Sequence, residues 1–162
     1  METLTGQQLS TGGMGRRSGD GIRHGSRVSS SDLRLRPVRL SDEGIVRSAH
    51  RELEADSFDF AIGLRPDTSW SAYVEQLDLV RRATQLPAPW VPATFLLAVV
   101  RDDLVGRTSI RHGLNDYLLA AGGHIGYAVL PQFRRRGFAT EILKQSLIVA
   151  RSYDVGRVLV TC

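Results

Sequence analysis

The stretch that decides the fold is "PQFRRRGFATEIL", residues 131–143, in which three consecutive arginines run into a glycine and then into a helical pattern. Like charges repel one another, and the N-terminus of a helix already carries partial positive charge. The N–H groups of the first turn have no partner within the helix. Free N–H donors and forked guanidinium groups together suit an anion such as a pyrophosphate. The stretch therefore predicts that an anion binds where this helix begins.

Small residues follow the arginines at the places where a ligand would approach. Gly137 removes a side chain beside the backbone, and Ala139 keeps the next inward position small. The alternative is a solvated basic helix start with a chance glycine, because an R-x-x-G-x-A match is weak by itself. Context favours the anion site, since the match directly follows a strand and opens a helix.

A strand–helix–strand unit surrounds this turn. "HIGYAVL" (124–130) is the first strand, and "RVLVTC" (157–162) is a buried-type final strand that should be its parallel neighbour. The helix between them, over 137–153, has an apolar stripe formed by Ala139, Ile142, Leu143, Leu147 and Ala150. Its outward residues are Glu141, Lys144, Gln145 and Arg151.

Upstream patterns complete an α+β fold with a mixed, mostly antiparallel sheet and flanking helices. The expected elements are an edge strand in "LRLRPVRL" (33–40), helices in "SDEGIVRSAHREL" (41–53, capped by Ser41) and near "SWSAYVEQLDLVRRATQ" (69–85), a hairpin over 94–112 joined at Asp102-Asp103, and a loop over 113–123.

Composition excludes several classes of protein. The chain has 162 residues, which suits one domain, and its 42% hydrophobic and 23% charged residues are ordinary for a globular protein. Cys162 is the single cysteine and the four histidines are not clustered, so neither a disulfide nor a metal is expected. No apolar run approaches a membrane span and no signal peptide begins the chain, so we expect no membrane partner and a cytoplasmic location.

Residues 1–31 are rich in Gly, Ser, Thr and Arg, which predicts a disordered N-terminal extension before a domain over 32–162. The alternative, a basic arm for nucleic acid, is weaker because the segment is short and mixed. The net charge of +4 is modest and scattered, and the 7% aromatic residues form no run interleaved with basic ones. No nucleic-acid partner is therefore expected.

The segment "GYAVLPQFRRRGFATEIL" (126–143) resembles the acetyl-CoA-binding segment of the GNAT N-acetyltransferase superfamily, whose signature is Q/R-x-x-G-x-G/A. Arg134, Gly137 and Ala139 take the signature positions. The longer pattern over 90–143 also resembles a group of predicted acetyltransferases of unknown substrate, and the resemblance extends over residues 33–162 in all.

The resemblance implies an acetyl-CoA-dependent enzyme that acetylates a primary amine of a small molecule or peptide by direct attack, without a metal. The pyrophosphate of CoA would bind at Arg134, Arg135, Arg136, Gly137, Phe138, Ala139 and Thr140. The pantetheine arm would pair with Tyr127, Ala128 and Val129. The N–H of Val129 would donate to the oxygen that becomes negative during the reaction.

The base that deprotonates the amine is less clearly marked. His124, on the same strand, is the nearest candidate, but an ordinary strand histidine with a satisfied hydrogen bond is the simpler reading. Asn115 and Asp116 precede that strand and could contact the acceptor, although a polar "LND" is as often a simple turn.

The resembled family continues past the final strand with a helix and two more strands, which often supply a tyrosine acid. The resemblance therefore implies a domain that is incomplete at its C-terminus, with little turnover alone, whose exposed terminal strand could pair with a second copy as a homodimer. The alternatives are a non-catalytic CoA-binding remnant and, less favoured, a nucleic-acid-binding protein. CoA competition and a steep salt dependence would separate the two.

Overall fold

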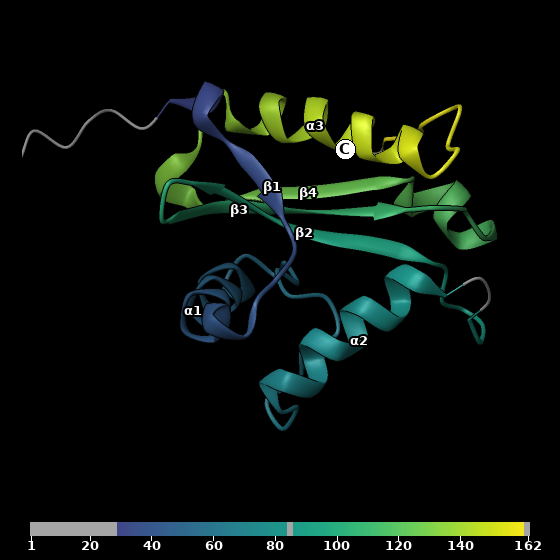
Figure 1. The fold of residues 1–162 in the computed structure, drawn as a ribbon, viewed down its shortest axis with the longest axis horizontal. Helices are drawn as coiled ribbons and strands as arrows, with labels where there is room; N and C mark the ends of the chain where they lie inside the picture. Colours follow the sequence, from purple (N-terminus) through teal and green to yellow (C-terminus); the bar gives the residue numbers. More distant parts are fainter. Residues whose placement is uncertain (1–28, 84–85, 161–162) are drawn as a thin grey trace, which may run out of the picture.

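A single antiparallel sheet lies between two layers of helix (Figure 1). The computed structural model describes residues 29–83 and 86–160. The sheet has the order β1-β2-β3-β4, with β1 at Arg34–Arg36, β2 at Ala93–Val100, β3 at Asp103–Arg111 and β4 at Ile125–Val129. One face is covered by α1 (Glu43–Glu54) and α2 (Trp70–Arg82), and the other by α3 (Phe138–Ser152). The predicted α+β class is confirmed.

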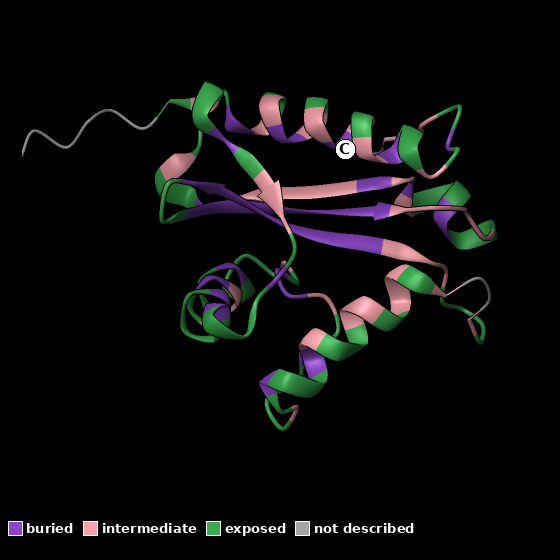
Figure 2. Ribbon diagram, in the orientation of Figure 1, coloured by how far each residue is buried: buried purple, intermediate pink, exposed green. Residues whose placement is uncertain are grey.

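The hairpin of β2 and β3 forms the buried centre of the molecule. Both strands are buried along nearly their whole length because helices cover both faces (Figure 2). The turn lies at Arg101 and Asp102, one residue earlier than predicted, since Val100 pairs with Asp103. Arg101 adopts a left-handed φ of 55°, as tight hairpin turns require.

A β-bulge interrupts this hairpin at Val105. Ala98 pairs with Gly106 and Val99 with Leu104, so Val105 has no partner in the register. Leu104 packs with the residues of α1 and α2, whereas Val105 packs with Phe138 and Ile142 of α3. The extra residue shifts the alternation of every later residue on β3.

The predicted helices are present, with corrections at their ends and faces. The N-cap of α1 is Asp42 rather than Ser41, because a short 3-10 helix, Leu40–Asp42, precedes it. The Asp42 carboxylate accepts from Arg36 at 2.6 Å and from the Arg39 N–H at 2.7 Å. The bond from Arg36 is the main reason why the pKa of Asp42 is lowered.

The buried face of α3 is offset from the predicted stripe. Phe138, Ile142, Ser146 and Ala150 are buried, while Ala139, Leu143 and Leu147 are half-buried. Gln145 does not point freely outward, because its amide bonds to both the C=O of Leu33 and the N–H of Leu35. Ser146 can be buried because its hydroxyl donates to the Thr108 hydroxyl of β3 at 2.9 Å.

Two predicted segments differ from the structure. Residues 113–123 are not an irregular loop, because Leu118–Gly122 form a π-helical turn. The predicted final strand is reduced, among residues 157–160, to one parallel bridge between Val160 and Ile125. Its direction is the expected one. Beside this bridge, the backbone N–H of His124 donates to the Leu159 carbonyl at 2.7 Å, and the N–H of Leu159 donates to His124 Nδ1 at 3.1 Å.

Of the segment predicted to be disordered, residues 1–28 lie outside the described residues. Ser30–Asp32, at the end of that segment, form a short 3-10 helix that contacts α3.

Candidate active site

The outer edge of β4 is available for main-chain pairing. The N–H of Leu130 donates to Val105 of β3 at 3.0 Å. Because successive residues of a strand point their N–H and C=O groups to opposite edges, those of Tyr127 and Val129 point away from β3. The C=O of Val129 accordingly accepts from Arg134 Nε at 3.2 Å. Within the described ranges, the only bridge on this edge is the one at Ile125.

The start of α3 lies beside this edge. Gly137 is the N-cap, with a left-handed φ of 80°, and no side chain caps the helix there. Arg135 is also left-handed, at 63°. These two residues let the chain turn sharply from β4 into the helix. The first-turn N–H groups of α3 have no partner within the helix.

A cavity of about 330 Å³ joins the strand edge to the helix start. Three groups of residues line it: residues 127–129, then Arg134 and Ala139, and finally Leu53, Asp56 and Phe58 from α1 and the segment after it. The structure therefore brings together five of the residues predicted from the motif. It adds three that sequence reasoning missed, because they lie far away along the chain and carry no local motif.

A family model for the acetyltransferase (GNAT) domain matches residues 32–162, which is most of the chain. The chain belongs to the GNAT acetyltransferase family. Membership indicates an acyltransferase. A search of curated proteins gave no match.

Two general findings concern the described residues, 29–83 and 86–160. No helix there is long and apolar enough to cross a membrane. The same residues contain no group of three or more His, Cys, Asp or Glu side chains placed to hold a metal ion.

The three arginines of the GNAT motif have different surroundings. Arg134 forms an exposed ion pair with Asp56 at 3.3 Å, besides its bond to Val129. The Arg136 guanidinium lies over the rings of Phe133 and Phe138, 5.7 and 5.5 Å from their centroids. Of the other motif residues, Arg135 and Thr140 are exposed and Phe138 is buried in the core. The exposed groups can meet a ligand, whereas Phe138 anchors the helix.

Arg107 of β3 is a buried cation that sequence reasoning missed. It is 4% exposed, and its guanidinium donates to the carbonyls of Phe60 (3.1 Å), Asp59 (2.9 Å) and Gly126 (3.1 Å). Burial lowers its pKa to about 10. Its position over the Phe58 ring, at 4.8 Å, adds a cation–π contact. Arg107 thus fastens the segment after α1 to β4, and this segment forms one wall of the cavity.

His124 does not occupy the predicted place. It precedes β4 instead of lying on it, and it does not line the cavity. Its Nδ1 accepts from the N–H of Leu159 at 3.1 Å. Burial, followed by the charge of Arg111, lowers the pKa of His124. The hydrogen bond from Leu159 links His124 to the segment that follows α3.

Asn115 belongs to a turn and not to the cavity. Its Oδ1 accepts from the N–H of Leu118 at 2.9 Å, and its Nδ2 donates to the C=O of Pro89 at 2.7 Å. The side chain therefore starts the π-helical turn and ties it to the segment before β2. Neither Asn115 nor Asp116 lines the cavity.

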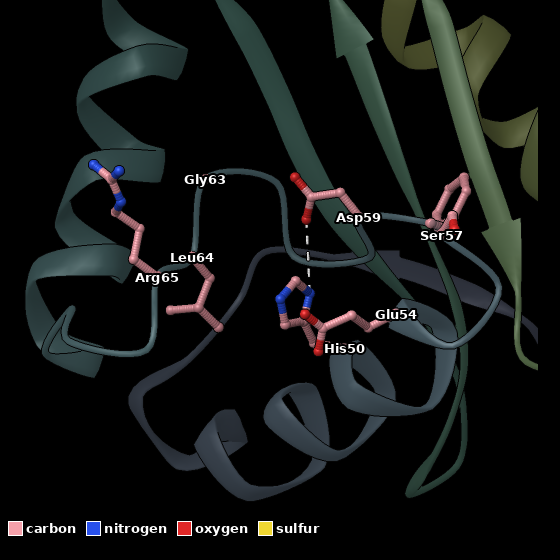
Figure 3. A pocket seen from close by; sticks show the side chains of 8 residues that line it. His50, Glu54, Ser57, Asp59, Gly63, Leu64 and Arg65 are labelled. Carbon is pink, nitrogen blue, oxygen red and sulfur yellow. Dashed lines mark ion pairs between the residues drawn. The ribbon is translucent and has the colours of Figure 1, made fainter.

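A second cavity, of about 350 Å³, is lined by the residues drawn in Figure 3. Phe58 lines both cavities, so the two adjoin at this residue. The other lining residues are His50, Glu54, Ser57, Asp59 and residues 63–65. The side chains of His50, Glu54 and Asp59 lie close together in Figure 3, whereas the Arg65 guanidinium points away from them.

Proposed function

We propose that this GNAT domain is an N-acetyltransferase that moves the acetyl group of acetyl-CoA to a primary amine by direct attack. One observation carries the proposal: a single cavity is lined by residues 127–129 at the free edge of β4 and by Ala139 in the first turn of α3, whose start has no side-chain cap. An elongated ligand with amide groups at one end and phosphates at the other matches this arrangement.

The residues present fit acetyl-CoA. The free edge of β4 offers N–H and C=O groups to the amides of a pantetheine arm, as a neighbouring strand would. The first turn of α3 offers N–H donors to a pyrophosphate. The exposed guanidinium groups of Arg134 and Arg135 add positive charge beside it. Ala139 leaves space in the cavity where a longer side chain would fill it.

Acetyl-CoA would supply a thioester: the amine nitrogen would form a bond to its carbonyl carbon and the C–S bond would break. Of the two protons that the ammonium loses, one would go to the thiolate and the other to solvent. The chain's own task is to hold and polarise that carbonyl. Val129 lines the cavity, and its N–H would donate to the carbonyl oxygen as that oxygen gains negative charge. The Arg134 side chain, through its bond to the Val129 C=O, keeps this peptide edge oriented.

Substitution of Ala139 by Glu tests the binding site. The new carboxylate would fill the cavity and repel the diphosphate, so we expect acetyl-CoA affinity to fall by about tenfold or more in calorimetry. Glu is a good helix former at a first turn, so the fold should be retained. Ile148→Glu, at an exposed position of the same helix, is the matched control. Equal affinities of both variants would refute the assignment.

Turnover is tested by measuring thiol release from acetyl-CoA with a panel of primary amines. Release that depends on the amine supports the acetyltransferase. Tight binding of acetyl-CoA without release by any amine would instead favour the non-catalytic CoA-binding alternative.

A further inference from the structure

The strand β1 forms one edge of the sheet, because it pairs with β2 on one side and has no strand on the other within the described residues. An edge strand ordinarily presents N–H and C=O groups with which a strand of another chain can pair. The N–H of Leu35 points away from β2, since it donates to a side chain of α3. Alternate residues face the same edge, so Leu33 also points outward. A strand added at β1 would therefore need the groups of Leu33 and Leu35.

Gln145 of α3 occupies these groups. Its Oε1 accepts from the N–H of Leu35 at 3.2 Å, and its Nε2 donates to the C=O of Leu33 at 3.0 Å. In a parallel pair of strands, one residue makes the same two bonds to the residues that flank its partner. The side-chain amide of Gln145 thus takes the place of a strand residue opposite Arg34.

The orientation of this amide is fixed by a further contact. Glu141 lies one turn earlier on α3, and its Oε1 accepts from Gln145 Nε2 at 2.9 Å. A flipped amide would turn its oxygen toward two acceptors, the Glu141 carboxylate and the Leu33 C=O. Leu33 is fully buried in a cluster with Phe138 and Ile142, which holds β1 and α3 together. The amide is therefore kept where it can bond to both outward groups.

The two ends of the β1 edge are occupied as well. The N–H of Leu33 donates to the C=O of Ser30 at 3.2 Å, within the short 3-10 helix before the strand. Pro37 is the next outward residue after Leu35, and a proline has no N–H. Its C=O accepts from the Arg36 guanidinium at 3.0 Å. Along residues 33–37, each outward N–H is thus either bonded within the chain or absent.

We propose that Gln145 blocks strand addition at β1, and that the partner it excludes is a second copy of this chain. Two identical edge strands can pair antiparallel about a two-fold axis, which makes a second copy the fitting partner. Such pairing would also bring the exposed Arg34 side chains of the two copies close together, which opposes it. The block leaves the outer edge of β4 as the edge that is open to an extended ligand. This inference does not depend on which ligand binds there.

Replacing Gln145 by Ala tests the block, because Ala removes the amide and favours the helix. We expect the Gln145→Ala variant of the full chain to dimerise with a dissociation constant lower than that of the parent by about tenfold or more. Light scattering after size-exclusion chromatography measures this over a range of protein concentrations. The buffer contains about 0.5 M NaCl, which screens the repulsion between the Arg34 side chains.

Ser146→Ala is the matched control. It removes a hydrogen bond between α3 and the sheet, from Ser146 to Thr108, but leaves the β1 edge occupied. We expect this variant to associate no more than the parent does. Equal dimerisation of the two variants would show that weakened packing of α3 causes the association, and would overturn the inference. Gln145→Met fills the same space without an amide and serves for the comparison if the Ala variant does not fold.

Hydrogen exchange at the N–H of Leu35 identifies the surface that associates. In the Gln145→Ala variant this N–H should exchange faster than in the parent at low protein concentration, and slow again as the dimer forms. A variant that stays as monomeric as the parent would refute the block. So would a dimer in which the N–H of Leu35 remains unprotected, because the association would then use another surface.

Discussion

At the scale of single residues, Val129 carries the clearest catalytic prediction. Its N–H points away from β3, so replacing Val129 by Pro removes this donor without removing a β3–β4 hydrogen bond. We expect kcat to fall by about 10²–10³-fold, the usual loss for one oxyanion donor. Val129→Ala keeps the N–H and is the control. Thiol-release assays of the two variants measure the difference, and equal kcat values would exclude the N–H of Val129 as the donor.

Arg107 is the residue whose loss should loosen the cavity wall. Arg107→Met removes the donors to Asp59, Phe60 and Gly126, and carbonyls left without a partner typically cost about 1–3 kcal/mol each when buried. We expect a lower free energy of unfolding in urea and faster proteolysis within residues 55–63. Arg101→Met, in the exposed turn of the same hairpin, is the control. A variant as stable and as protease-resistant as the parent would contradict this role.

At the scale of elements, the bulge in β3 decides which side of the sheet Arg107 faces. A regular strand starting from Leu104 would have placed Arg107 with Val105, on the α3 side. The extra residue turns it toward α1 and α2, where it meets Phe58 and Phe60. A glycine inside an apolar strand is a known mark of a bulge, and Gly106 was the signal available in the sequence. The alternation of apolar and polar residues along β3 does not by itself reveal the bulge.

Gly106 also allows β3 and β4 to approach closely. A Cβ at this position would collide with the Ala128 carbonyl oxygen and lie 3.2 Å from Ile142 Cδ1. A backbone oxygen can move only by disturbing the β3–β4 ladder, so Gly106→Ala should cost about 1–3 kcal/mol, as overpacking does. Gly44→Ala, in α1 with open space around it, should instead stabilise by about 0.5–1 kcal/mol. Urea unfolding measures both, and a neutral Gly106→Ala would argue against the close approach.

At the scale of the whole molecule, the two halves of the site differ in how far the sequence reveals them. The half made by β4 and α3 is continuous in the chain, so its strand, turn and helix produce a recognisable motif over residues 126–143. The half made by α1 and the segment after it depends on contacts across the sheet, such as Arg107 to Phe60. No local pattern encodes these contacts, and Asp56, Phe58 and the second cavity were therefore missed.

The stability of the fold at acidic pH should depend on two histidines that link distant parts of the chain. His112 bonds to Thr94 at 2.8 Å and stacks on Tyr153, and its pKa is lowered by burial and then by the charge of Arg81. The pKa of His124 is lowered by burial and then by Arg111, and its Nδ1 must stay unprotonated to accept from Leu159. The fold thus favours the neutral form of both rings.

The sign of the pH dependence follows from these shifts. Near the ordinary histidine pKa of about 6.5, the unfolded chain binds more protons than the folded one, because the pKa of both histidines is lower in the folded state. The free energy of unfolding should therefore fall as the pH drops through about 6.5 and then through the folded pKa values. Asp42, with a lowered carboxyl pKa, adds its own loss only in stronger acid. Urea unfolding between pH 7.5 and 5 measures the slope. The His112→Asn, His124→Asn double variant should be less stable at pH 7.5 but nearly flat across this range, and a slope equal to that of the parent would show that other groups govern the acid sensitivity.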